Sequence, residues 1–202
     1  MASIGIVYFS MYGSTHDLVS EVATGVTDDG GQAHLRRLPH GLPDDVASDD
    51  AVQAAQQAQE DVAFAEVDEL AEFDGIVFGS GTRFGSASSQ LQGFFDQCGP
   101  LWAEGTLVDV PAGFVTSAST MHGGHETTIM SMSTFAFHLG MPIVPMGYTH
   151  DATGETRSGG GPYGPSLLMP QDGDKEEPTH QEAAIARAYG ARMHRIAQKL
   201  AA

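Results

Sequence analysis

Hydroxyl side chains and a glycine stand together directly after the first apolar run of the chain. The run Ser3–Phe9 is followed by Ser10-Met-Tyr-Gly-Ser-Thr15, and an amphipathic stretch begins at that point. Free backbone amides at a helix N-terminus, helped by serine and threonine hydroxyls, bind anions without needing a lysine. The segment therefore predicts an anion cradle, and ordinary helix capping by the same residue types is the alternative.

The established phosphate-binding motifs narrow the class of ligand. A Walker loop needs a Gly-Lys pair, which the sequence lacks, and this turn does not read G-x-G-x-x-G. Cys98 is the only cysteine and lies far from the turn, which disfavours a cysteine-based phosphatase. Asp17 falls inside the following helix rather than at the strand end, which disfavours a phosphoacceptor site. Non-covalent binding of a phosphate monoester remains, and in a flavodoxin-like sheet that phosphate most often belongs to FMN.

Small and glycine-rich segments follow two further apolar runs. They read Ser80-Gly-Thr-Arg-Phe-Gly85 and Ser117-Ala-Ser-Thr-Met-His-Gly-Gly124. Small residues let the backbone approach a planar ligand, and the first of the two adds an arginine and a phenylalanine. If the runs are neighbouring parallel strands, all three segments meet at one crevice outside the sheet.

Apolar runs alternate with amphipathic stretches, which predicts a doubly wound α/β fold. Strands are expected at Ser3–Phe9, Ala33–Leu38, Asp74–Gly79, Val110–Ser117 and Pro142–Met146. Helices are expected around Leu18–Val26, around Leu91–Cys98, over about Glu126–Leu139 and over about Thr179–Leu200. The pattern predicts a five-stranded parallel sheet with helices on both faces, in one domain over residues 1–202. Cys98 falls at helical spacing with apolar residues, which indicates packing rather than chemistry.

Two segments interrupt the alternation. Asp44–Ala65 is rich in alanine, glutamine and aspartate and predicts a solvated helix inserted before the third strand. Thr149–Pro178 is rich in glycine and proline, and a loop of this length is usually functional or part of an assembly contact.

Acidic residues dominate the charge of the chain. There are 26 Asp and Glu against nine Lys and Arg, for a net charge of −17, and only Lys175 and Lys199 are lysines. Such a field disfavours nucleic acids and anionic membranes as partners. An acidic, lysine-poor surface is typical of a high-salt cytoplasm, and an acidic mesophile protein is the alternative. The chain shows neither a signal peptide nor a membrane span, so we expect a soluble, cytoplasmic protein.

Several motifs together resemble the WrbA family of flavodoxin-like, FMN-dependent NAD(P)H:quinone oxidoreductases. They are Tyr8-Phe-Ser-Met-Tyr-Gly13, Gly81-Thr-Arg-Phe-Gly85, Phe95-Asp-Gln97 with Leu101-Trp102, Met141–Tyr148 and Gly161-Pro-Tyr-Gly164. The likeness runs from Ile4 to the last helix. It implies a flavodoxin-like fold, bound FMN, NADH or NADPH as co-substrate, a quinone substrate and a homotetramer.

The resemblance also implies roles for individual residues. The FMN phosphate would be held by Ser10, Met11, Tyr12, Gly13, Ser14 and Thr15. The isoalloxazine would be lined by Thr82, Arg83, Phe84 and Gly85, and the third flavin loop would be Ser117, Ala118, Ser119, Thr120, Met121, His122 and Gly123. Trp102 matches an aromatic lid over the substrate face, and Tyr12 matches a position associated with the nicotinamide nucleotide. The family commonly has two adjacent histidines where this chain reads His138-Leu139, so His138 is the substrate-side candidate of that pair.

The function expected from these observations is two-electron reduction of quinones through FMN, with ping-pong hydride transfer and no catalytic side chain. The alternatives are a flavodoxin, which carries one electron to protein partners and has no substrate pocket, and an FMN-dependent regulatory protein. His122-Gly-Gly-His125-Glu126 is not a HExxH motif, so no metal site is expected.

Overall fold

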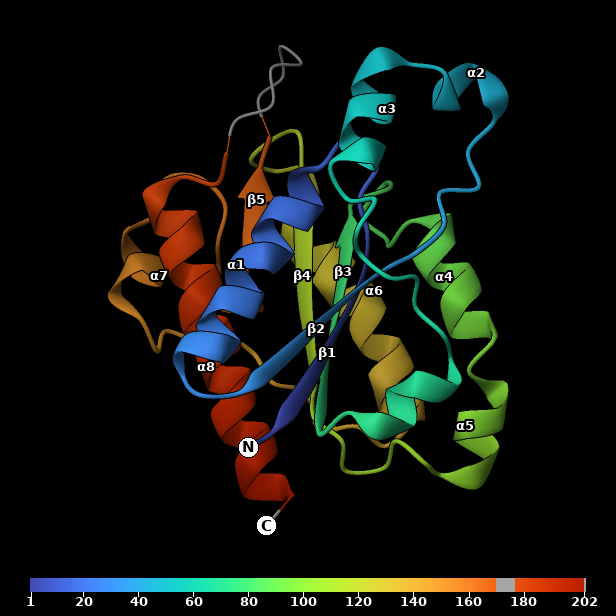
Figure 1. Ribbon diagram of the computed structural model, residues 1–202. Coiled ribbons are helices and arrows are strands. Elements are labelled where there is room, and N and C mark those ends of the chain that lie inside the picture. The colour runs from blue at the N-terminus through green and yellow to red at the C-terminus, as the bar shows by residue number, and fades with distance from the viewer. Residues whose placement is uncertain (170–176, 202) are drawn as a thin grey trace.

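A five-stranded parallel sheet forms the centre of the computed structural model, which describes residues 1–169 and 177–201 (Figure 1). The strands are β1 Ser3–Phe9, β2 Gln32–Arg37, β3 Gly75–Gly81, β4 Ala112–Ala118 and β5 Ser166–Leu168. Their order in the sheet is β2-β1-β3-β4-β5. The sequence predicts a doubly wound parallel sheet, and the observed order brings the carboxyl ends of β1, β3 and β4 to one edge, where such sheets bind ligands.

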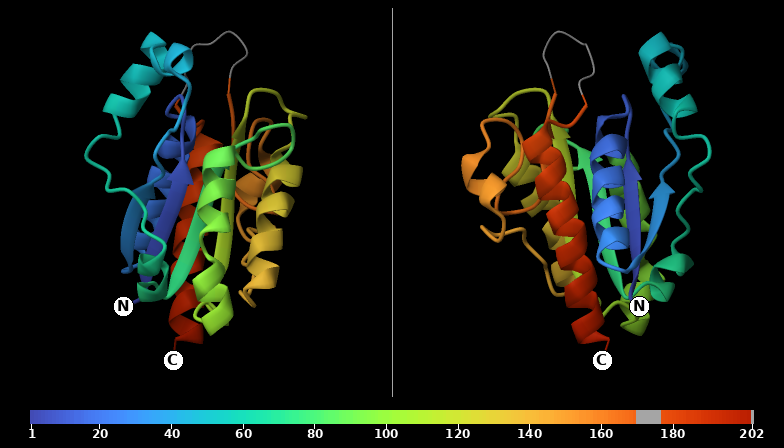
Figure 2. Two further views of the ribbon diagram at one scale, coloured as in Figure 1. Left: turned by 90° about the vertical axis from the view of Figure 1, so that its right-hand side faces the viewer. Right: turned by 60° about the vertical axis from the view of Figure 1, so that its left-hand side comes forward.

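Helices cover both faces of the sheet, and the two views of Figure 2 show one face each. One face carries α1 Ser14–Asp28 and α8 His180–Leu200, with the short α7 Asp151–Glu155 beside α8. The other carries α4 Ser89–Asp96, α5 Gly99–Glu104 and α6 His125–His138. Successive side chains of a strand point to opposite faces. In β1, Val7 and Phe9 therefore enter the core under α4 and α6, while Ile6 and Tyr8 enter the core under α1 and α8.

The fifth strand is not where the sequence analysis expects it. The segment Pro142–Met146 makes a single parallel bridge, between Ile143 and Ala112 at the start of β4. Prolines have no amide to donate, so this segment cannot extend a ladder. The true β5, Ser166–Leu168, pairs instead with the last residues of β4 and comes from the Thr149–Pro178 segment. Residues 170–176 of that segment lie outside the described residues.

Helices α1 and α8 approach each other closely enough for their backbones to touch. A Cβ atom on Gly25 of α1 would lie 1.9 Å from the carbonyl oxygen of Arg187 in α8. A Cβ atom on Gly190 of α8 would lie 2.0 Å from the carbonyl oxygen of Val22 in α1. Any side chain at either glycine would force the helices apart, so the last helix of the chain is locked onto the first.

The insertion before β3 is more structured than the single solvated helix that the sequence predicts. It forms two helices, α2 Asp44–Ala47 and α3 Asp50–Gln57, followed by the 3-10 turn η1 Asp68–Glu72. Figure 1 places α2 and α3 beyond the carboxyl ends of β1 and β2. Val52 and Ala55 of α3 are buried. The insertion therefore packs against the edge of the sheet where ligands bind.

Candidate functional site

The three loops that the sequence analysis singles out meet at the carboxyl edge of the sheet. We name them the first loop (10–15), the second loop (82–85) and the third loop (117–123). The Thr15 and Ser117 hydroxyls of the first and third loops lie 3.0 Å apart. The Thr82 amide donates to the Ser117 carbonyl oxygen at 2.8 Å, and an Arg83 guanidinium nitrogen lies 3.4 Å from the Met11 sulfur. The loops thus form one continuous surface.

The first loop offers donors that have no acceptor among residues 1–169 and 177–201. The hydroxyls of Ser10 and Ser14 are buried and bond to no described residue. The backbone N–H groups of Met11 to Thr15 take part in none of the hydrogen bonds formed among the described residues. Buried polar groups are nearly always hydrogen-bonded, so an unpaired set points to a missing acceptor. The arrangement fits a phosphate group with several acceptor oxygens.

The second loop is a tight hairpin that exposes the aromatic ring of Phe84 to solvent. Arg83 and Ser86 exchange both backbone hydrogen bonds, at 2.8 and 3.0 Å. Phe84 and Gly85 between them have φ values of 53° and 79°, the signature of a type I′ turn. A phenylalanine in this left-handed region is strained, and its side chain is fully exposed. A strained residue that exposes an aromatic ring to solvent is typical of a ligand-contacting position.

The third loop is pinned at both ends. The Ala118 carbonyl oxygen accepts a 2.8 Å hydrogen bond from the amide of Met169, just beyond β5. At the other end, the buried His125 ring bonds through Nε2 to the Thr120 carbonyl oxygen at 3.1 Å. A carbonyl only accepts, so Nε2 carries the proton. Between these points Ser119, Met121 and His122 are exposed.

His125 is kept neutral by its surroundings. Burial lowers the pKa of the His125 imidazole, against smaller opposing effects of its bond to Thr120 and of the Glu126 and Glu182 carboxylates. Its Nδ1 atom is buried and bonds to no described residue. The sequence analysis considers His125 only as a metal ligand, whereas its position here is that of a support for the third loop. No group of three His, Cys, Asp or Glu side chains suited to a metal ion occurs among the described residues.

The one cation of the three loops is Arg83. Its guanidinium donates to the Thr82 carbonyl oxygen at 2.8 Å and makes no ion pair with any described residue. The chain has a net charge of −17, yet Arg83 has no carboxylate partner among the described residues. An unpaired arginine beside free hydrogen-bond donors favours an anionic ligand.

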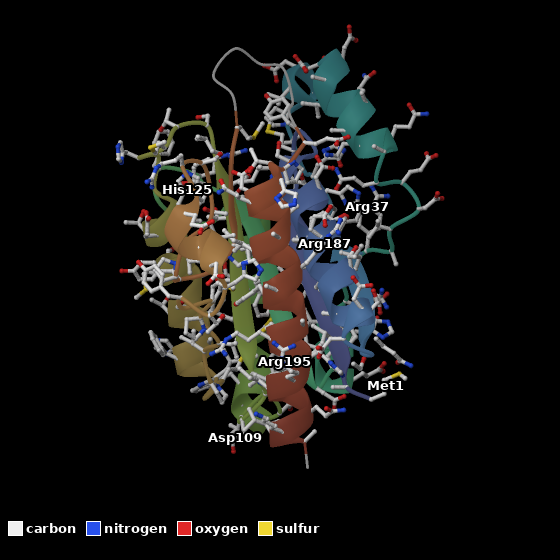
Figure 3. All side chains as sticks on the ribbon, turned by 90° about the vertical axis from the view of Figure 1, so that its left-hand side faces the viewer. Met1, Arg37, Asp109, His125, Arg187 and Arg195 are labelled. Carbon is white, nitrogen blue, oxygen red and sulfur yellow. The ribbon has the colours of Figure 1, made fainter. Side chains whose placement is uncertain are left out.

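Trp102 and His138 lie away from the three loops of their own chain. Trp102 belongs to α5, which leads into the turn before β4, where the Asp109 amide donates to the Gly140 carbonyl oxygen just after α6. His138 is the last residue of α6 and is exposed. Figure 3 shows Asp109 at the lower end of the molecule and His125 in its upper half. Within one chain, neither side chain can cover the site.

Cys98 is buried, as expected, and burial raises the pKa of its thiol to about 12.

Two residues that the sequence analysis overlooks contact the first loop. Gln56 at the end of α3 and Gln59 just after it donate from their side-chain amides to the Ser10 carbonyl oxygen, at 2.9 and 3.2 Å. Glutamine in an alanine-rich polar helix normally indicates a solvated surface. No local pattern reveals a partner more than 40 positions earlier in the chain.

Fold and site together define an α/β protein of the flavodoxin-like type, with unpaired hydrogen-bond donors in the first loop. Residues 9–155 match the family described as NADPH-dependent FMN reductase, and the chain belongs to that family. A relative from Geobacter sulfurreducens, named NAD(P)H dehydrogenase (quinone), is 42% identical over 200 residues, 96% of this chain and 97% of the relative. A relative of the same name from Trichlorobacter lovleyi is 40% identical over the full length of both chains.

Solved structures share the fold. A flavodoxin, WrbA-like protein from Agrobacterium tumefaciens superposes with a TM-score of 0.68 at 23% identity, over 98% of this chain and 99% of that chain. A flavodoxin from the domain Archaea gives a TM-score of 0.60 at 15% identity, over 99% of both chains. No helix among residues 1–169 and 177–201 is long and apolar enough to cross a membrane.

Proposed function

We propose that this protein reduces quinones by two electrons with NADH or NADPH, through bound FMN. The observation that carries the proposal is the set of unpaired donors in the first loop, placed beside two loops suited to a planar ring. The similarity of 37–42% to relatives named NAD(P)H dehydrogenase (quinone), over nearly their whole length, supports the substrate class.

The residues of the three loops would hold FMN. Ser10, Ser14 and the amides of Met11–Thr15 would bind its phosphate, and the second and third loops would line its ring. When bound, FMN would supply the two-electron chemistry that links the nicotinamide to the quinone. The side chains bind and orient, and none acts as an acid or a base in this proposal. Replacing Ser10 and Ser14 by alanine tests the phosphate site, because each lost hydrogen bond to a charged group contributes about 1.5–3 kcal/mol.

The two substrates would use one face of the ring in turn. The second and third loops would line one face of the ring, so nicotinamide and quinone would compete for the other, near the exposed Tyr12. Hydride transfer requires the reacting atoms within about 3–3.5 Å, which favours stacking of each substrate on the flavin. Parallel initial-rate plots and competitive inhibition at high concentration of either substrate are the kinetic test.

A homotetramer would complete the site. Apolar side chains remain exposed on and beside α5 and α6, among them Trp102, Val108, Met130 and Phe137. Exposed apolar clusters of this kind mark protein interfaces. In the proposed assembly, Trp102 and His138 of one subunit reach the open flavin face of a neighbour, which their own chain cannot provide. Sedimentation velocity measures the assembly state directly.

The acidic surface would adapt the protein to a saline cytoplasm. Most of the acidic residues are exposed, for example Asp44, Asp45, Asp49 and Asp50 around α2 and α3. Hydrated carboxylates tolerate high salt, which in turn screens their mutual repulsion.

A flavodoxin that shuttles single electrons is the second candidate, and the fold it shares with the archaeal flavodoxin favours it. Anaerobic mixing of the flavin-loaded protein with NADH separates the two functions. Rapid bleaching of the flavin followed by recolouring with a quinone supports the reductase. A flavin that stays yellow with both NADH and NADPH contradicts the proposal.

A further inference from the structure

Helix α3 is held over the first loop by its own cap and by its buried face. The Asp49 carboxylate caps the helix by accepting hydrogen bonds from the amides of Ala51 and Val52, at 3.0 and 3.2 Å. Val52 and Ala55 point into the protein, and Gln59 beyond the helix end is only 2% exposed. The glutamine amides at this end of the insertion therefore have defined positions.

Those amides act on the carbonyl oxygens of the first loop. Gln56 donates to the carbonyl oxygens of Ser10 and Met11, at 2.9 and 3.3 Å, and Gln59 donates to Ser10 at 3.2 Å. Gln59 is itself steadied by a 2.8 Å bond to the Ala55 carbonyl oxygen. In a trans peptide the C=O and N–H groups point in opposite directions. Drawing the carbonyls of Ser10 and Met11 toward α3 turns the N–H groups of Met11 and Tyr12 away from α3.

The orientation of these peptides decides how the loop interacts with an anion. A carbonyl oxygen turned toward a phosphate repels it, whereas an N–H group in the same place attracts it. The first loop contains no lysine or arginine. Its affinity for an anion must therefore come from correctly aimed dipoles, which gain from being fixed before the ligand arrives.

We propose that Gln56 and Gln59 are positioning residues that set the first loop in its phosphate-binding conformation. They touch neither the flavin nor the substrates and act through the peptides of residues 10–12. The insertion before β3 thus has a role in cofactor affinity. This inference rests on the proposed binding of FMN at the first loop.

The affinities of the apoprotein for FMN and for riboflavin, which lacks the phosphate, test the inference. Both are measured by quenching of flavin fluorescence. Gln56→Leu removes the donor without adding charge, and we expect it to weaken FMN binding by about tenfold while riboflavin binding changes less than about twofold. A variant that is merely less well folded would lose both ligands together.

Gln57 provides the matched control, because it has the same side chain on the same helix, is exposed, and its side-chain amide makes no hydrogen bond with a described residue. Gln57→Leu should leave both affinities unchanged. Gln56→Glu and Gln57→Glu, made as separate variants, each add one negative charge at neighbouring positions. Only Gln56→Glu should strongly lower the ratio of FMN affinity to riboflavin affinity.

Three results would overturn the inference. If Gln56→Leu and Gln56→Glu keep the wild-type ratio of FMN to riboflavin affinity, the glutamine does not position the loop, although the FMN site stands. If the Gln56 and Gln57 variants lose the preference equally, the effect is a general electrostatic one. A wild-type protein that binds riboflavin as tightly as FMN would refute the phosphate site and the positioning role together.

Discussion

The hydroxyl oxygens of Thr15 and Ser117 lie 3.0 Å apart, although 102 positions separate the two residues in the chain. The bond joins the first turn of α1 to the carboxyl end of β4, across the end of β3. It connects the loop proposed to bind the FMN phosphate with a loop proposed to line the ring. This hydrogen bond therefore couples two parts of the proposed cofactor site.

A double-mutant cycle measures this coupling. Thr15→Val and Ser117→Ala should each weaken FMN binding, because the partner hydroxyl is left without its bond. The double variant should bind FMN about 1 kcal/mol better than the sum of the single losses predicts. Strictly additive losses in flavin titrations would show that the two loops bind the cofactor independently.

Phe84 carries a strain that its replacement should relieve. Asparagine tolerates the left-handed conformation, and Asn-Gly is the preferred pair in a type I′ turn. Phe84→Asn should raise the free energy of unfolding of the apoprotein by about 1 kcal/mol in urea titrations. The same variant should weaken flavin or substrate binding by about tenfold, since stacking on an aromatic ring contributes ~1–3 kcal/mol.

The control for this experiment is Phe84→Leu, which keeps the strain and removes the ring. It should lose binding without gaining stability. A Phe84→Asn protein no more stable than wild type would mean that the turn stores no strain.

His125 should make stability depend on pH in one direction. Its folded-state pKa is lowered, mainly by burial, below the usual value of 6.5. The native state therefore binds fewer protons than the unfolded state, and stability falls as the pH drops below 6.5. His125→Gln keeps a donor for the Thr120 carbonyl oxygen but cannot titrate. Melting temperatures of both proteins between pH 7.5 and 5 should show a steeper acid loss for wild type, and equal slopes would contradict the assignment.

Trp102→Ala should weaken quinone and nicotinamide binding together while the affinity for FMN stays constant. The reason is the proposed contact with a neighbouring subunit, because Trp102 lies far from the loops of its own chain. Co-assembly with a Ser10→Ala/Ser14→Ala protein, which keeps Trp102 but binds FMN poorly, should restore turnover per bound flavin in mixed oligomers. Mixed oligomers with no more activity than the two separate variants would place the lid elsewhere.

Molar KCl should raise the melting temperature and favour assembly, because salt screens the repulsion among 26 acidic residues. The comparison is made against dilute buffer at the same pH. A melting temperature that stays flat or falls would favour an acidic mesophile protein.

The sequence predicts the elements whose signals are local. The apolar run Ser3–Phe9, the hydroxyl-rich turn after it and the amphipathic stripe of α1 appear in the structure as expected. The doubly wound parallel sheet follows from the alternation of apolar runs with amphipathic stretches and from the handedness of the crossovers. The unpaired donors of the first loop could be anticipated because they belong to consecutive residues, and anion binding there stays a prediction.

The features that the sequence does not predict depend on contacts between distant segments. β5 has only three residues and lies among glycines and prolines, so its apolar run is too short to be recognised as a strand from the sequence. Gln56 and Gln59 meet Ser10 only because the insertion folds back over the sheet. Trp102 lies far from the three loops because of the direction in which α4 and α5 run. A sequence motif carries no information about that direction.

The interlocking glycines of α1 and α8 bear on the order in which the protein becomes functional during its synthesis. The first loop leads into α1, near the beginning of the chain, and one side of α1 is covered by α8, which packs against it backbone to backbone. A ribosome releases α8 last. A growing chain that has already made all three loops still lacks this helix, so we expect stable FMN binding only after α8 has been synthesised and packed against α1.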